Sequence, residues 1–147
     1  MAVEVAPQFR HVRDWIFDLD NCLYPATTGL FALIDERMGA YIQRLLDCDP
    51  AEARRVQKEH FHTHGTTLAG LMRHHEVDPH DFLEKVHDVP LDLIQRDDRL
   101  GAALGRLPGR KFVFTNGDAP YARRVLEAIG IHERFDDLHD IHASSYR

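Results

Sequence analysis

The sequence predicts an α/β protein in which a parallel sheet core is interrupted by a helical insertion. A short apolar run at residues 14–19, DWIFDL, ends on carboxylates and is typical of a buried parallel strand. Residues 25–95 carry helix signals throughout, and strand and helix signals alternate from residue 96 onward. We therefore expect a core made of residues 1–24 and 96–147 and a helical cap made of residues 25–95.

Helix-start signals and apolar spacing predict four helices in the cap, which is expected to be helical throughout. In the first helix, at residues 28–46, apolar residues recur every three or four positions, and Thr27 or Thr28 is the expected N-cap. Its apolar stripe, expected to belong to the core of the cap, is Leu30, Ile34, Met38 and Tyr41. The other three helices begin at Asp49-Pro50, at Thr66 or Thr67 and at Asp78-Pro79, and are expected to end at Gly65, at Met72 and before Pro90.

The second part of the core is predicted as helix, strand, helix and strand. The expected ranges are 97–107 for the first helix, 111–115 for the strand KFVFT, 119–129 for the next helix and a third strand within 138–141. Pro108-Gly109 and Gly130 supply the helix stops.

Composition narrows the classes of protein that this chain can represent. The chain has 147 residues, 44% of them hydrophobic and 29% charged, which is enough for a folded domain with its own core. A net charge of -6 excludes a broad basic surface, so we expect no nucleic-acid partner. No apolar stretch approaches the ~18 residues of a membrane span, and the two cysteines, Cys22 and Cys48, are expected to be free thiols. We therefore expect a cytoplasmic protein without a membrane partner.

Polar residues follow the first two strands at the edge where parallel sheets place their ligand sites. Asp18 and Asp20 end the first strand, and Thr115, Asn116 and Gly117 end the second. Residues two apart in an extended chain point the same way, so both carboxylates can face one metal and one substrate. An Asp-x-Asp or Thr-Asn-Gly sequence can also simply form a turn.

The segment FDLDNCLY, Phe17 to Tyr24, resembles the first motif of the haloacid dehalogenase superfamily, and Thr115 with Asn116-Gly117 resembles its second motif. The insertion after the first motif resembles the superfamily's mobile cap. More narrowly, the residues from Asp20 to Tyr24 and the segment GTTLAGL at 65–71 resemble the pyrimidine 5′-nucleotidase-like branch. The resemblance covers almost the whole chain and implies a Rossmann-like core.

This resemblance implies hydrolysis of a phosphate monoester through an aspartyl-phosphate. Asp18 is then the nucleophile and Asp20 the general acid and base, which suits two neighbouring carboxyls of unequal pKa. Mg²⁺ is the implied cofactor, held by the Asp18 side chain and the Asp20 backbone carbonyl. Thr115, Asn116 and Gly117 are the implied phosphate donors. The expected substrate is a nucleoside monophosphate or another small phosphorylated metabolite.

The sequence also departs from the superfamily pattern. Cys22 stands where Thr or Val is usual and is interpreted as a small packing residue. The Lys of the third motif and the acidic pair of the fourth cannot be assigned, because none of Lys58, Lys85 and Lys111 matches and the sequence stops at Arg147. The core therefore looks incomplete, and we expect the chain to bind Mg²⁺ weakly, to have little activity and to form a homo-oligomer or need a missing C-terminal segment. The alternatives are a catalytically incompetent binding or regulatory module of the same fold, and a haloacid dehalogenase.

Two further groups of cap residues are candidates for binding. Thr66 and Thr67 are candidate substrate contacts, although helix capping explains them equally well. His60 and His64 are four apart and could share a helix face as a zinc pair, but the choice of a third ligand between His74 and His75 is arbitrary from sequence. These histidines are instead expected to be partly solvated, and those near Gly65 to face the cleft.

Overall fold

The computed structural model describes residues 5–146 and confirms the α/β class, with a parallel sheet and a helical insertion between its first two strands. The strands are β1 (Asp14–Phe17), β2 (Arg110–Phe114) and β3 (Asp137–His139). The helices are α1 (Leu30–Leu46), α2 (Pro50–His64), α3 (Thr67–His75), α4 (Pro79–Val86), α5 (Asp98–Arg106) and α6 (Ala119–Ile129). Short 3-10 helices lie at Pro7–Phe9, Ala26–Thr28 and His132–Arg134.

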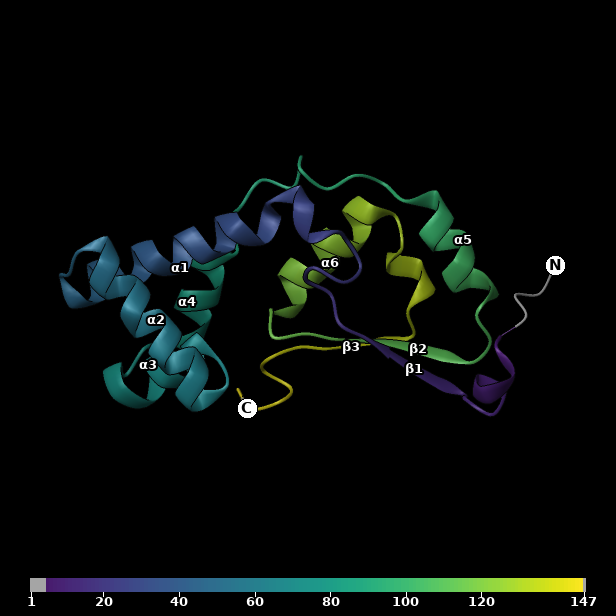
Figure 1. The fold of residues 1–147 in the computed structure, drawn as a ribbon, viewed down its shortest axis with the longest axis horizontal. Helices are drawn as coiled ribbons and strands as arrows, with labels where there is room; N and C mark the ends of the chain where they lie inside the picture. The colour runs from purple at the N-terminus through teal and green to yellow at the C-terminus, as the bar shows by residue number, and fades with distance from the viewer. Residues whose placement is uncertain (1–4, 147) are drawn as a thin grey trace.

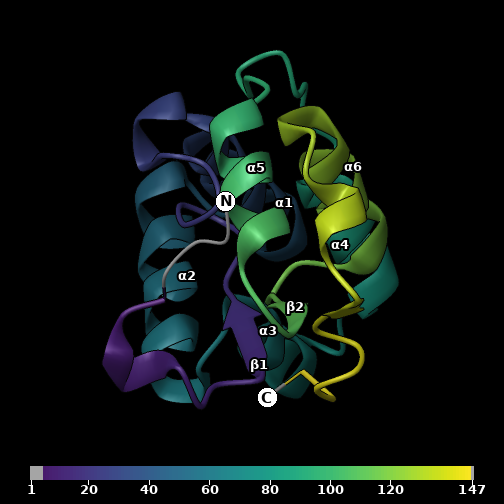
Figure 2. The same ribbon diagram turned by 90° about the vertical axis from the view of Figure 1, so that its right-hand side faces the viewer.

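The sheet has the order β1-β2-β3, and both strand pairs are parallel. Helices α5 and α6 lie on the same side of the sheet, whereas α1 to α4 form a separate group beyond its carboxyl end (Figure 1). The view along the sheet shows the same arrangement, with α5 in front of the helical insertion (Figure 2). Strand β1 is an edge strand of this sheet within residues 5–146, and its Ile16 is 72% exposed.

Aspartate N-caps start the helices where the sequence predicts them. The Asp49 side chain accepts a hydrogen bond from Glu52 N at 2.8 Å, and Asp78 accepts one from His80 N at 3.0 Å. Proline follows both caps and occupies the first helical turn, where no backbone donor is needed. Helix α6 spans the predicted residues 119–129 and ends at Gly130.

Three predictions about the cap helices are wrong in detail. The first helix begins at Leu30 after Gly29, which has a φ of +80°, so neither Thr27 nor Thr28 is its N-cap. Helix α3 continues beyond Met72 to His75. Helix α4 ends at Val86, and residues 87–95 form turns and irregular backbone, so the insertion is not helical throughout to residue 95. Pro90 lies in this stretch and has no backbone N–H to donate to a helical hydrogen bond, so the stretch forms a connection that returns to the core.

The hydrophobic core consists of two clusters that meet at Met38. The first contains Leu30 and Ile34 together with Val113 of β2 and residues of α6. The second is formed within α1 to α4, and Ile141 from beyond β3 packs into it. The apolar stripe of α1 therefore does not belong wholly to the cap: its first half packs against the sheet core, and this tethers α1 to both parts of the molecule.

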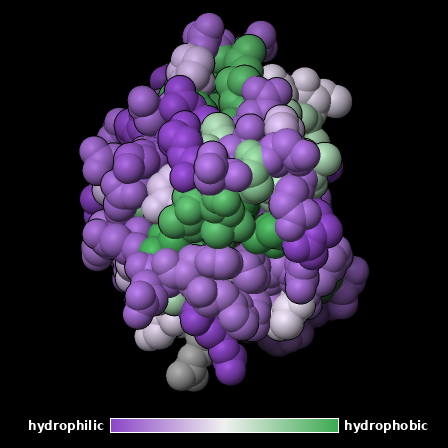
Figure 3. Space-filling view, turned by 90° about the vertical axis from the view of Figure 1, so that its left-hand side faces the viewer, coloured by the Kyte–Doolittle hydropathy of each residue, from purple (hydrophilic) through white to green (hydrophobic). Residues whose placement is uncertain are grey.

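The surface of the helical end is mostly hydrophilic and surrounds a small apolar area (Figure 3). None of the helices in the described part of the chain combines the length and apolar character needed to cross a bilayer.

Candidate active site

The loops that follow β1 and β2 meet the α2–α3 turn around a cavity of about 280 Å³. The sheet core contributes Asp20, Asn116 and Gly117 to the lining, and the helical insertion contributes Thr66 and Thr67. Five residues that the sequence singles out are thus brought together from three separate segments. The apolar part of the lining comes mainly from α1, with Phe31, Ile34 and Met38, and from α4, with Leu83 and Val86.

Asp20 is a half-buried carboxyl in the lining of this cavity. Its Oδ1 accepts hydrogen bonds from the hydroxyls of Tyr24 at 2.6 Å and Tyr121 at 2.7 Å. Burial raises the pKa of Asp20, and the charge of Asp18 adds to this effect, whereas the two tyrosine hydrogen bonds oppose it. The net result is a carboxyl with a raised pKa, a property that suits a proton donor near neutral pH.

The tyrosines around Asp20 belong to a longer polar chain. Burial raises the pKa of both hydroxyls, and the charge of Asp20 raises it further, so both remain protonated donors. The Tyr121 ring stacks on His87 with a centroid distance of 4.1 Å, and His87 Nδ1 donates to Asp118 Oδ1 at 3.0 Å. Burial opposes ionisation of Asp118, but the hydrogen bond and charge of His87 outweigh it and lower its pKa. Asp118 also caps α6, so the network is anchored to a helix end.

Asp18 lies outside this buried network. It is exposed, its Oδ1 accepts from Leu19 N at 2.8 Å, and its Oδ2 has the Cys22 thiol 3.9 Å away. Cys22 is exposed as well, so its interpretation as a packing residue is wrong. Local desolvation and the nearby carboxylates raise the pKa of this thiol, which leaves it protonated and weakly nucleophilic. Cys22 and Cys48 are both free, as predicted.

Thr115 is buried and forms a tight turn with the residues after it. Its Oγ1 accepts a hydrogen bond from Gly117 N at 3.0 Å, while its own backbone N–H donates to His139 O at 2.9 Å. Gly117 lies close to the Tyr121 ring, since an added Cβ would stand 3.0 Å from a ring carbon. Asn116 is exposed and lines the cavity. The Thr115 hydroxyl proton and the Asn116 side chain therefore remain available, whereas the Gly117 N–H is already used within the turn.

The two threonines of the α2–α3 turn are both buried and both line the cavity. Thr66 is the N-cap of α3, because its Oγ1 accepts from Ala69 N at 3.0 Å. The Thr67 hydroxyl donates to the Gln57 carbonyl at 3.2 Å. Capping thus accounts for Thr66, and each hydroxyl oxygen keeps a lone pair that can face a ligand.

The sequence analysis missed three residues that line the Asp20 cavity or lie next to it. His87 and Tyr121 belong to the Asp20 network, and Lys58 is the only lysine or arginine that lines this cavity within residues 5–146. Tyr24 could have been suspected, because it stands four residues after Asp20. No local signal marks His87, Tyr121 or Lys58, because their positions depend on how the insertion and α6 pack.

Two oxygen donors near Asp18 could hold a hard cation. The Asp18 Oδ2 has only a distant thiol as partner, and within the described part of the chain no backbone N–H donates to the Asp20 carbonyl. A carboxylate and a carbonyl match the oxygen preference of Mg²⁺, which usually keeps several water ligands. The donor set therefore fits a magnesium ion, whereas the nearby thiol is a poor ligand for it.

Comparison with known proteins shows similarity to a yeast protein. The chain is 26% identical to Phosphate metabolism protein 8 of Saccharomyces cerevisiae over 136 residues. The match covers 84% of this chain but 42% of the yeast protein, so the chain spans less than half of the length of this relative. No family model matches the chain. The chain is thus a distant homologue of a protein named for phosphate metabolism.

Proposed function

We propose that this protein is a Mg²⁺-dependent phosphomonoesterase that works through an aspartyl-phosphate on Asp18. The observation that carries the proposal is the pair Asp18 and Asp20 at the carboxyl edge of a parallel sheet. One carboxyl is exposed, and the other is half-buried, accepts hydrogen bonds from two tyrosines and has a raised pKa. Two neighbouring carboxyls with unlike environments can divide the work of a nucleophile and an acid. The distant homology to a phosphate metabolism protein supports the same chemistry.

In the first step, an Asp18 oxygen attacks phosphorus, and the bond between phosphorus and the substrate's leaving oxygen breaks. Asp20 donates its proton to that oxygen, so the product leaves as a neutral alcohol. In the second step, Asp20, now ionised, takes a proton from a water molecule that attacks the aspartyl-phosphate. This step releases inorganic phosphate and restores both carboxyls to their starting state.

The carboxylate of Asp18 and the carbonyl of Asp20 would hold the magnesium ion. When bound, the ion supplies positive charge that offsets the repulsion between the phosphate and the two carboxyls. The Thr115 hydroxyl and Asn116 would donate to the phosphoryl oxygens, with Gly117 holding their turn in place. Lys58 adds a positive charge on the cap side of the cavity.

The proposed substrate is a small phosphorylated metabolite such as a nucleoside monophosphate. A cavity of about 280 Å³ suits a small ligand, and Thr66 and Thr67 offer polar contacts at its cap side. The resemblance of 65–71 to the pyrimidine 5′-nucleotidase-like branch supports this choice. A dehalogenase has no alkoxide to protonate, so the raised pKa of Asp20 favours the phosphatase.

The proposal is tested by para-nitrophenyl phosphate turnover with and without Mg²⁺, together with acid quenching of the phosphoenzyme. We expect slow but Mg²⁺-dependent turnover and an acid-stable, hydroxylamine-sensitive phosphoenzyme, both abolished by Asp18→Asn. Asp14→Asn is the matched control, because Asp14 lies at the opposite end of β1 and pairs with Arg110. Unchanged turnover in Asp18→Asn would refute the assignment. Binding of the substrate by the unaltered chain without any turnover or phosphoenzyme would instead identify a binding module.

A further inference from the structure

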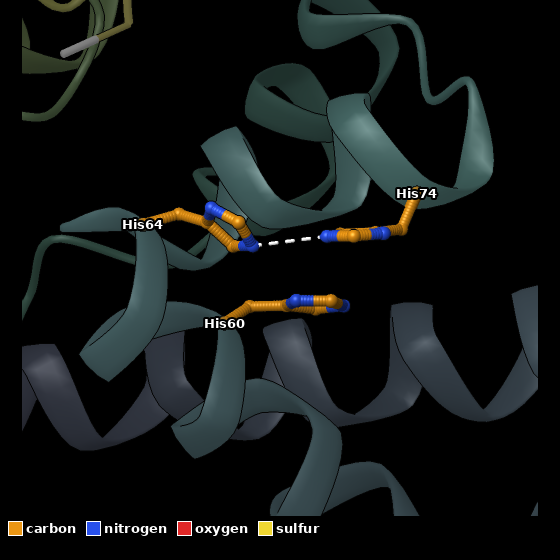
Figure 4. A group of neighbouring side chains, drawn as sticks. All are labelled: His60, His64 and His74. Atoms are coloured by element: carbon orange, nitrogen blue, oxygen red, sulfur yellow. Dashed lines mark hydrogen bonds between the residues drawn. The ribbon is translucent and has the colours of Figure 1, made fainter.

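Three imidazole rings converge between α2 and α3, away from the cavity that Asp20 lines. His60 and His64 come from α2 and His74 from α3; the His64 and His74 rings face each other, and the His60 ring lies roughly parallel to that of His74 (Figure 4). The Nε2 atoms of His64 and His74 are 3.0 Å apart. One ring nitrogen from each of the three residues lies within 4.8 Å of the others. The sequence-based choice between His74 and His75 is therefore resolved in favour of His74.

His60 supplies an independent sign that the cluster lacks a ligand. The residue is only 8% exposed, and its Nε2 is buried without a hydrogen-bond partner among residues 5–146. Buried polar atoms are nearly always paired in folded proteins, so an orphaned imidazole nitrogen calls for an unrecorded partner. The expectation that His60 is partly solvated is thus wrong.

The local fold brings the three rings together for identifiable reasons. His60 and His64 are four residues apart, so they share one face of α2. Gly65, with a φ of +86°, ends the helix and turns the chain back into α3. Gly70 lets the His60 ring lie directly on the α3 backbone, because a Cβ at position 70 would collide with the His60 side chain. The His74 ring then stacks on His60, with a centroid distance of 5.4 Å.

The spacing and donor type suit a transition metal. In a tetrahedral zinc site with Zn–N bonds of ~2.0–2.1 Å, ligand nitrogens stand about 3.3 Å apart. The His64 and His74 Nε2 atoms, 3.0 Å apart, are close to this separation, and the donor atoms of all three residues lie within 4.8 Å of one another, which is within reach of one ion after side-chain rotation. Imidazole nitrogens favour zinc, copper, nickel and iron, whereas Mg²⁺ prefers oxygen.

The surroundings of the cluster leave the imidazoles free to bind an ion. The rings line a surface recess of about 910 Å³, which gives an ion and a water ligand access from solvent. Glu52 and Glu59, which also line the recess, are both bonded to Arg55.

We propose that His60, His64 and His74 form a binding site for a divalent transition-metal ion of the zinc type, completed by water. The ion would join the C-terminal halves of α2 and α3 and so fix the turn that contains Thr66 and Thr67. This site is separate from the Asp18 and Asp20 region, and it does not depend on the phosphatase proposal.

The test is a titration of the metal-free chain with Zn²⁺ or Co²⁺ in excess Mg²⁺, which fills oxygen sites in advance. We expect one ion per chain with micromolar or tighter affinity, a rise in melting temperature and Co²⁺ absorption typical of nitrogen ligands in low coordination. His74→Asn is the chosen variant, because His74 is exposed and its replacement leaves the core intact. It should weaken binding by more than about a hundredfold, since even the loss of an outer-shell partner costs 10–100-fold.

His62→Asn is the matched control, because His62 is exposed on the same helix and lies outside the cluster. It should bind like the unaltered chain. Gly70→Ala, which displaces His60, should weaken the Zn²⁺ affinity while far-ultraviolet circular dichroism remains helical. The proposal is overturned if the unaltered chain binds neither ion. It is also overturned if His74→Asn binds as tightly as His62→Asn, or if only Asp18→Asn removes the binding.

Discussion

Asp20 is the residue whose surroundings differ most from those of a carboxyl in water. Burial favours its neutral form, while the hydroxyls of Tyr24 and Tyr121 stabilise the charged form. Burial is the larger effect, so the group keeps its proton to higher pH than an ordinary aspartate. Such a group can donate a proton to a leaving alkoxide, and the donated proton matters most where the alkoxide is a strong base.

Asp20→Asn should therefore slow the release of poor leaving groups more than that of good ones. We expect a loss of about 10²–10⁴-fold for an alkyl phosphate, the usual contribution of general acid catalysis, and a smaller loss for para-nitrophenyl phosphate. Steady-state rates for a series of aryl and alkyl phosphates measure this difference. Equal losses across the series would make Asp20 a structural or metal-site residue.

Tyr121→Phe should move the basic limb of the pH profile of kcat/KM to higher pH. The Tyr121 hydroxyl stabilises the ionised form of Asp20, so its removal raises the pKa of that carboxyl further. The acid then stays protonated to higher pH, with a shift of up to about one unit if the bond contributes ~1.4 kcal/mol. The stack on His87 is retained by Phe.

Tyr41→Phe is the control for this pH experiment. Its hydroxyl donates to Asp81 in the helical insertion and does not contact Asp20. Its profile should match that of the unaltered chain. A shift of the limb to lower pH in Tyr121→Phe would show that the titrating group is not Asp20.

Local sequence predicts Asp18 and Asp20 as a pair but not the environment that makes them different. Their spacing after an apolar run locates them at a strand end, and both features lie within a few residues. Tyr121, in contrast, is separated from Asp20 by 101 positions. Its contribution depends on the packing of α6 against the loop after β1, which no local pattern encodes.

At the scale of elements, helix starts are the best predicted features, because an Asp-Pro pair and its first turn are contiguous in sequence. Helix α1 shows where this reasoning fails: a glycine with positive φ begins the helix, and the threonines before it form a 3-10 turn. The face that each helix presents to the cavity is also not local. Lys58 lines it because α2 turns that side toward the sheet edge.

The α2–α3 turn should determine which substrates the site prefers. Thr67→Val keeps the shape of the side chain but removes the hydroxyl that lines the cavity, so preference among nucleoside monophosphates should change several-fold. Turnover of para-nitrophenyl phosphate should change less, because that substrate offers no nucleoside to contact. Thr66→Val is less informative, since loss of the N-cap also costs α3 about 1 kcal/mol.

Thr63→Val is the control for this substitution. Thr63 is exposed on α2 and lines the histidine recess instead of the Asp20 cavity. For each variant, the rate with each nucleotide of a panel is divided by the rate with the aryl phosphate, and these ratios are compared between Thr67→Val and Thr63→Val. If Thr67→Val lowers the turnover of nucleotides and of the aryl phosphate by the same factor, Thr67 does not determine specificity.

At the scale of the whole molecule, the alternation of strands and helices predicts the parallel sheet and its order of elements. It does not predict that both hydrophobic clusters share α1, or that Ile141 packs into the helical insertion. These contacts join segments that are distant in sequence, and their geometry comes from the packing of complete elements.

The open side of the sheet leads to a prediction about association between copies of this chain. Ile16 of β1 is 72% exposed and Phe114 of β2 is 47% exposed, and α5 and α6 lie on the same side of the sheet (Figure 1). Burial of apolar area contributes about 25 cal/mol per Å², so pairing of two such surfaces is favourable, and an unpaired edge strand adds hydrogen-bonding capacity. Light scattering after gel filtration should therefore show a mass that rises above the monomer mass as the concentration increases.

Ile16→Lys should reduce this rise without loss of the folded state, because the side chain is already largely in solvent and a charge opposes edge pairing. Leu93→Lys, at another exposed apolar residue, should leave the rise unchanged. A monomer mass at every concentration, or equal behaviour of the two lysine variants, would show that the β1 surface does not mediate self-association.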